Sequence, residues 1–177
     1  MPSEIPPTST CSLSHAKLML MAEEFPPARL RPLQIIYLAL VMGVVVLFGV
    51  GTFLGLQSTG EEVDEVAALM AYVGMGAPVV LYFVSNQIFG YMIARGDVEG
   101  DALGAVRAAL IAKAGLVEVG AMIGGVAWLM LCLQTNVAHI PQIYFGVFLG
   151  PLAMLLNAMH YFPTPERIRW WLLSREV

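Results

Sequence analysis

The sequence alternates between long apolar runs and short polar connections. Four runs are each long enough to cross a hydrocarbon core about 30 Å thick, which takes about 20 helical residues. No stretch has the apolar–polar alternation of a membrane barrel strand. The pattern therefore predicts an all-α fold, a membrane four-helix bundle of two consecutive helical hairpins. The predicted spans are residues 33–56, 66–94, 108–133 and 143–162.

The polar ends of the chain predict two tails beside one transmembrane domain. Residues 1–32 would be an N-terminal tail, residues 33–162 the transmembrane domain and residues 163–177 a C-terminal tail. The N-terminal tail has no apolar run long enough for a cleaved signal peptide, so we expect the first span to be a retained anchor.

Short interfacial helices are expected in both tails. Residues 14–25 could lie on the lipid surface, although two glutamates weaken this interpretation. In the C-terminal tail, Thr164 supplies an N-cap, Pro165 a first helical position and Glu166 a first-turn acid. A helix should therefore begin there.

Composition supports the membrane class. Hydrophobic residues make up 58% of the chain and charged residues 12%, against about 25% charged residues in soluble domains, and the mean hydropathy is +0.75. The expected partner is the lipid bilayer, and the sequence contains no nucleic-acid-binding module.

The charges also predict an orientation. The connections at residues 57–65 and 134–142 contain no Lys or Arg, so all nine basic residues fall on one side of the predicted bundle. By the positive-inside rule, we expect a protein of the cytoplasmic (inner) membrane with both termini in the cytoplasm. The acidic connection before the second span is read mainly as helix capping, with Ser58 or Thr59 as the cap.

Glycines are spaced for close helix packing in three of the predicted spans. Small residues at i, i+4 let membrane helices approach closely. The alternative is that glycine is simply common in membrane helices. The candidate packing residues are Gly43, Gly51, Gly55, Gly120, Gly124, Gly146 and Gly150.

One carboxylate, Glu118, lies near the middle of the third span. With a rise of 1.5 Å per residue, it is about 5 Å from the predicted midplane, and Ser85, Asn86 and Asn157 lie at about 8 to 9 Å on the same side. These residues predict a polar cluster inside the bundle. The cluster could be a proton or ion site, or Glu118 could be a neutral acid that hydrogen-bonds to an asparagine and fixes helix packing.

Lys113 is not expected to neutralise Glu118. Five helical residues correspond to a rotation of about 140°, so the two side chains do not share a face. We expect Lys113 to extend to the cytoplasmic interface instead.

The sequence offers no catalytic or metal-binding motif. Neither cysteine has metal or redox spacing, and the three histidines are scattered over different levels. We therefore expect no enzyme, no cofactor and no metal site.

Residues 91–131 (YMIARGDVEGDALGAVRAALIAKAGLVEVGAMIGGVAWLML) resemble the loop and second helix of subunit c of rotary ATP synthases. That family has a polar cytoplasmic loop followed by a mid-membrane carboxylate. The resemblance implies that Glu118 is the ion-binding carboxylate. Bulky Tyr72, Tyr82 and Phe83 depart from that family's glycine-rich first helix. As a whole, the chain resembles uncharacterised bacterial four-span integral membrane proteins.

Two functions remain open at this point. The first is a structural or accessory protein that packs, through its glycine-rich helix faces, against itself as a homo-oligomer or in a larger membrane complex. The second is a small proton- or ion-translocating protein, similar to a proteolipid, that uses Glu118.

Overall fold

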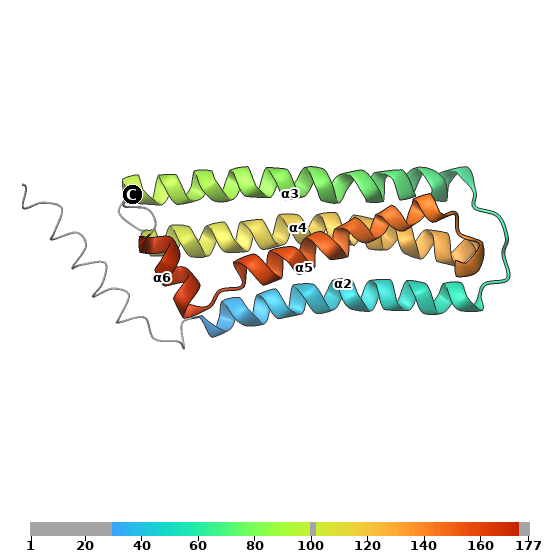
Figure 1. The fold of residues 1–177 in the computed structure, drawn as a ribbon, viewed down its shortest axis with the longest axis horizontal. Coiled ribbons are helices and arrows are strands. Elements are labelled where there is room, and N and C mark those ends of the chain that lie inside the picture. Colours follow the sequence, from blue (N-terminus) through green and yellow to red (C-terminus); the bar gives the residue numbers. More distant parts are fainter. Residues whose placement is uncertain (1–29, 100–101, 174–177) are drawn as a thin grey trace, which may run out of the picture. The chain divides into compact units, whose positions relative to one another are not determined.

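The computed structural model describes residues 30–99 and 102–173. Residues 33–162 form one compact unit, and the described residues on either side of it belong to a second unit. The expected helix over residues 14–25 lies outside the described part. The elements are α2 (Arg31–Gln57), α3 (Glu65–Glu99), α4 (Ala102–Gln134), η2 (Val137–His139), η3 (Gln142–Phe148), α5 (Leu149–Tyr161) and α6 (Pro165–Leu173) (Figure 1).

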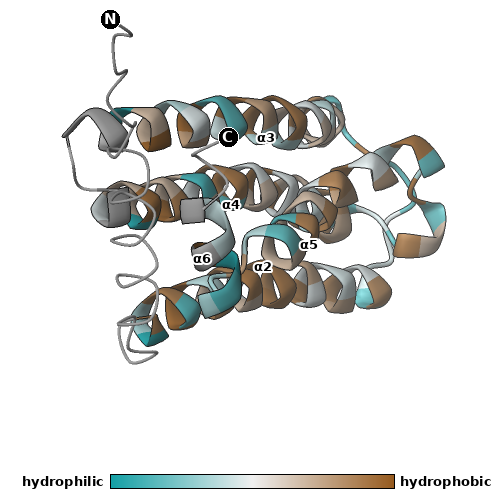
Figure 2. Cartoon of the chain, turned by 60° about the vertical axis from the view of Figure 1, so that its left-hand side comes forward, coloured by the Kyte–Doolittle hydropathy of each residue, from teal (hydrophilic) through white to brown (hydrophobic). Residues whose placement is uncertain are grey.

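The all-α fold with four membrane-length helices is confirmed, and no strand occurs among the described residues. In Figure 2 the hydrophobic colour runs along α2, α3, α4 and α5, whereas hydrophilic residues lie mostly toward the helix ends. The apolar segments are Arg31–Gln57, Glu65–Arg95, Gly104–Gln134 and Gln142–Tyr161.

The fourth apolar segment differs from the others in its backbone. It begins as the 3₁₀ helix η3 and becomes α-helical only at Leu149. Pro151 is the third residue of α5, where its missing N–H group costs no internal helix hydrogen bond. The segment spans 20 residues, against 27 to 31 in the other three.

Glycines allow α3, α4 and α5 to pack closely. A Cβ atom on Gly120 would lie 2.9 Å from the Cα atom of Pro78, and one on Gly150 would lie 2.8 Å from the Cα atom of Ala121. Because these neighbours are backbone atoms, a larger side chain would push the helices apart. In Figure 1, α5 crosses in front of α4 between α2 and α3.

Aromatic side chains pack against one another toward the end of the bundle that carries the α2–α3 connection. The Trp128 ring lies 4.8 Å from the Phe148 ring, which itself lies 4.9 Å from the Phe48 ring, measured between centroids. The Trp128 indole donates a hydrogen bond of 3.0 Å to the Thr52 hydroxyl of α2. The Phe48 and Trp128 rings are buried in this half, and the Phe148 ring, 36% exposed, packs against both from the surface.

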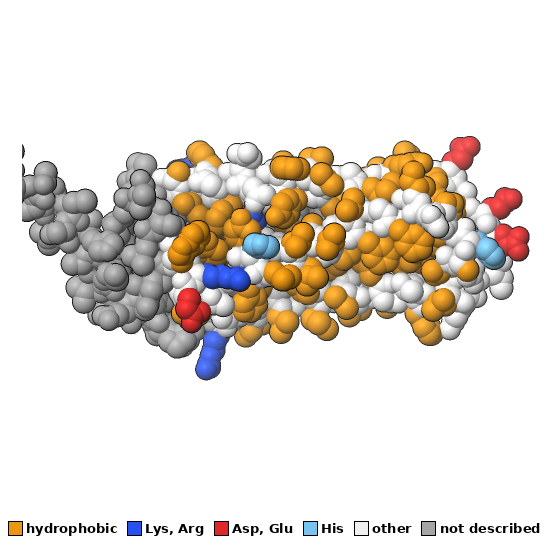
Figure 3. Space-filling view, in the orientation of Figure 1, with side chains coloured by type: hydrophobic (Ala, Val, Ile, Leu, Met, Phe, Trp, Pro, Cys, Tyr) orange, Lys and Arg blue, Asp and Glu red, His pale blue; other side chains and the backbone are white. Residues whose placement is uncertain are grey.

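The two connections at that end hydrogen-bond to each other. The Asn136 side chain donates to the Ser58 carbonyl at 2.9 Å, and the Thr135 hydroxyl donates to the Glu62 carbonyl at 2.7 Å. Acidic side chains gather at this end in Figure 3. The predicted cap of α3 was wrong: Asp64, not Ser58 or Thr59, accepts the Ala67 N–H at 2.7 Å. Asp64 directly precedes the helix, so its carboxylate reaches the first-turn N–H groups.

The second unit contains α6, which begins where the sequence predicts. The Thr164 hydroxyl accepts the Arg167 N–H at 3.3 Å, as an N-cap does. Pro165 is the first helical residue, and Glu166 is the acid of the first turn. The predicted C-terminal helix is thus confirmed.

Candidate functional site

Glu118 lies on the outer side of α4, not inside the bundle. It is half-buried and borders a surface depression with Val119, Met122 and Val126 of its own helix and Met70 of α3. It is one residue from the centre of the apolar segment Gly104–Gln134. No hydrogen bond or ion pair of its carboxyl group occurs within the described residues.

The bundle interior instead holds Lys113. Its side chain is fully buried, with 0% of its surface exposed, so the expected extension to the interface was wrong. The Lys113 ammonium donates a hydrogen bond to the Asn86 side-chain oxygen of α3. Lys113 is six residues, or roughly 9 Å of helix, from the centre of its apolar segment.

Three aromatic rings surround the Lys113 ammonium. Its nitrogen is 3.5 Å from the centroid of the Tyr161 ring, 5.3 Å from that of Phe89 and 5.6 Å from that of Tyr82. The negative face of an aromatic ring attracts a cation, and the attraction strengthens when water is excluded. The rings and the amide therefore stabilise a charge for which the described residues supply no carboxylate within ion-pair distance.

Asn157 of α5 lies in the same part of the interior and is fully buried. Within the described structure, neither polar atom of its amide has a hydrogen-bond partner of good geometry. The Tyr37 hydroxyl of α2 is close to this amide but donates to the Leu110 carbonyl at 3.2 Å. A buried amide without a partner costs free energy, which a hydrogen-bonding group placed beside Asn157 would reduce.

The structure therefore brings together a different set of residues from the one predicted. Asn86 bonds to Lys113, and Ser85 is buried with its hydroxyl bonded to the Tyr82 carbonyl of its own helix. Asn157 is buried in the interior, whereas Glu118 lies on the outside of the bundle. We call the group of Tyr82, Asn86, Lys113, Asn157 and Tyr161 the polar layer.

Six of the seven candidate packing glycines lie against other elements of the same chain. They are Gly51, Gly55, Gly120, Gly124, Gly146 and Gly150. Gly43 has open space beside it, and so does Gly115, a glycine outside the predicted set that lies one turn from Glu118. The closely spaced pairs are thus occupied within the monomer.

Sequence reasoning missed Lys113 and its aromatic neighbours. The sequence signal that could have found Lys113 is the helix face on which the glycines of the third span lie. Lys113 precedes Gly120 by seven residues, which places it within about 20° of the same helix face, whereas Glu118 precedes it by two residues and points away. The glycine face is the buried one, so Lys113 points inward.

No group of three His, Cys, Asp or Glu residues in the described ranges could hold a metal ion. Cys132 is a buried free thiol. The His160 ring is bonded to the Leu156 carbonyl at 2.9 Å. Cys11 and His15 lie outside the described residues.

Comparison of the chain with protein families, curated proteins and solved structures found no match. Its class is defined by the helices: four of them are long and apolar enough to cross a bilayer. The chain is an integral membrane protein.

Proposed function

We propose that this protein is a structural or accessory membrane protein that self-associates through the outer face of α4. The observation that carries the proposal is the position of Glu118, an acid at the centre of an apolar segment with only apolar residues around it. A charged carboxylate that contacts lipid at the helix centre costs about 2.5 to 3.5 kcal/mol by the lower estimates. A partner that hydrogen-bonds to it would lower this cost.

The residues around Glu118 suit a second transmembrane helix. Gly115, with open space beside it, lets another backbone come close. Val119, Met122 and Val126 are exposed at spacings of three and four residues, and Ile111 is exposed eight residues before Val119, so the four form one stripe along α4. Lipid chains are as apolar as this stripe, so association depends on close packing and on the polar group, both of which are present here.

A second copy of the chain is the partner that fits the chemistry best. A protonated carboxyl group has both a donor and an acceptor. In a dimer with two-fold symmetry, the same patch meets itself, so two Glu118 side chains could satisfy each other. A helix of another protein with a hydrogen-bonding group at this depth is the competing partner.

We also propose that both termini and the α3–α4 connection lie in the cytoplasm, in the inner membrane. Arg95 and Arg107 flank that connection, whereas Glu61, Glu62 and Glu65 lie at the opposite end of the bundle. The positive-inside rule favours this orientation.

The alternative function is proton or ion translocation by a proteolipid-like protein that uses Glu118. A half-buried acid at bilayer depth could take up and release a proton. Against this function, Glu118 borders a depression on the outer surface, and the buried Phe48 and Trp128 rings occupy the interior of one half of the bundle. Self-association is therefore favoured.

The proposal can be tested by energy transfer between labelled chains in liposomes. Glu118→Leu should weaken association by roughly three- to thirtyfold, the worth of one interhelical hydrogen bond in a membrane, whereas Glu118→Gln should retain most of it. Val46→Leu, on the exposed face of α2, is the matched control. Equal association of wild type and Glu118→Leu would contradict the proposal. Proton flux through the liposomes that Glu118→Gln abolishes would favour the alternative.

A further inference from the structure

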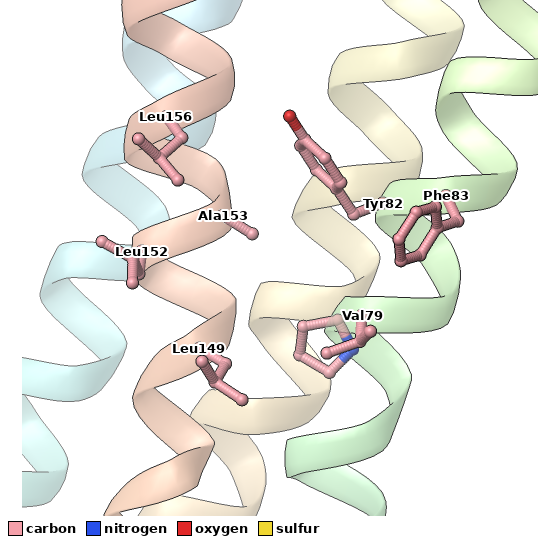
Figure 4. A pocket seen from close by; sticks show the side chains of 8 residues that line it. Val79, Tyr82, Phe83, Leu149, Leu152, Ala153 and Leu156 are labelled. Carbon is pink, nitrogen blue, oxygen red and sulfur yellow. The ribbon is translucent and has the colours of Figure 1, made fainter.

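A lateral groove between α3 and α5 lies beside the polar layer and shares Tyr82 with it. It has a volume of about 200 Å³, and its walls are almost entirely apolar. Figure 4 shows Tyr82 between the helices, with its hydroxyl directed toward the end of the groove where Leu156 lies. The lining includes Tyr82, Phe83, Leu149, Leu152, Ala153 and Leu156.

The groove and the polar layer lie next to each other along both helices. Asn157 follows the groove residue Ala153 by one helical turn, and Asn86 follows Tyr82 by one turn. Residues four apart lie on the same helix face. Tyr82 joins the two regions directly, because its ring borders the groove and its centroid lies 5.6 Å from the Lys113 nitrogen.

We propose that the α3–α5 groove binds the chain of a single-chain amphiphile with a carboxylate head, of the fatty-acid type, and that Lys113 and Asn157 hold the carboxylate. Lys113 offers a buried cation without an acid near it in the described residues. Asn157 offers a fully buried amide without a hydrogen-bond partner of good geometry. A carboxylate would accept hydrogen bonds from both groups, and the one to the ammonium would be charge-assisted.

Depth and size favour a single-chain acid over a phospholipid of the bilayer. Lys113 lies roughly 9 Å from the centre of its apolar segment, inside the boundary of a hydrocarbon core with a half-thickness of about 15 Å. The phosphate of a phospholipid lies outside that boundary and would have to be drawn inward together with two chains. The groove volume of about 200 Å³ accommodates part of one chain and is too small for two.

The test uses the full chain in phosphatidylcholine nanodiscs and a hexadecanoate probe that carries a photoreactive diazirine. Labelling should map to residues of the groove. Unlabelled hexadecanoate should compete at a concentration at least about tenfold lower than hexadecanol, because only the acid pairs with the ammonium. Equal competition by the acid and the alcohol would overturn the proposal.

Two variants test recognition of the carboxylate head and binding of the apolar chain separately. Lys113→Met should remove the preference for the acid, and Ala153→Phe should fill the groove and lower labelling by both compounds. Val46→Phe, on the exposed face of α2, should change neither result. If Lys113→Met still prefers hexadecanoate to hexadecanol, or if Ala153→Phe is still labelled in the groove, the proposal is overturned. Each variant gives an independent result, so one of them can fold poorly without removing the test. Thermal unfolding of each variant identifies such a loss of fold.

Discussion

The Lys113 nitrogen lies 3.5 Å from the centroid of the Tyr161 ring, so the last residue of α5 covers a lysine of α4. Tyr161 is one turn beyond Asn157 on α5, and both residues face the same interior region. The contact therefore joins the end of α5 to α4. Lys113 also bonds to Asn86, so this one side chain contacts both α3 and α5.

Replacement of Tyr161 should therefore destabilise the bundle more when the aromatic ring is removed than when it is kept. Tyr161→Leu removes the ring from the ammonium, and we expect a loss of about 1 to 2 kcal/mol in the free energy of unfolding, the worth of a desolvated cation–π contact. Tyr161→Phe keeps the ring and should lose less. Unfolding in mixed micelles measures both values, and an equal loss in the two variants would contradict the role of the ring.

The glycines against α3 and α5 should tolerate no side chain. Gly120→Leu places new atoms against the Pro78 backbone, so we expect a destabilisation of about 1 to 3 kcal/mol, as for overpacked cores. Gly76→Ala in α3 has open space beside it and should be neutral or slightly stabilising. The midpoint of thermal unfolding compares the two, and equal midpoints would contradict the close approach.

Asp64 should stabilise both α3 and the joined connections. Its carboxylate accepts the Ala67 N–H and a second hydrogen bond of 2.7 Å from the Gln134 amide. Asp64→Ala should cost about 1 kcal/mol through the lost cap alone, whereas Asp64→Asn should retain most of the stability because asparagine is an equally good cap. The same unfolding measurement tests this pair, and equal losses in both variants would show that the cap contributes nothing.

Topology reporters should give opposite results at the two ends of the bundle. A phosphatase that is active only outside the cytoplasm should be active when fused after Gly60 and inactive when fused after Gly100. An active fusion at Gly100 would reverse the proposed orientation. A cytoplasmic reporter fused at the same two positions should show the complementary pattern.

The sequence predicted the helices well because the length of an apolar run is set by the thickness of a bilayer. It was less informative about which side of each helix faces inward. In a membrane, both the lipid-facing and the interior sides of a helix are apolar, so hydrophobicity does not show which side faces inward. Glu118 was therefore predicted inside the bundle, although it lies on the outside. Small residues do indicate the inward side of a helix, because Gly120 and Gly124 lie against neighbouring helices.

The polar layer was only partly predictable for a related reason. Depth along a helix follows from the rise per residue, so the sequence could place Asn86 and Asn157 at a similar expected level. Lys113 was expected at the interface because a long side chain can usually reach water. Tyr82, Phe89 and Tyr161 make burial tolerable, and their convergence from two other helices depends on tertiary packing.

The most direct test of self-association through α4 is disulfide cross-linking in native membranes. In a chain with Cys11→Ser and Cys132→Ala, Met122→Cys should form cross-linked dimers on oxidation, and Val46→Cys on the outer face of α2 should not. Adding Glu118→Leu to the Met122→Cys chain should reduce the dimer yield. Equal yields from Met122→Cys and Val46→Cys, or a yield unaffected by Glu118→Leu, would contradict the account.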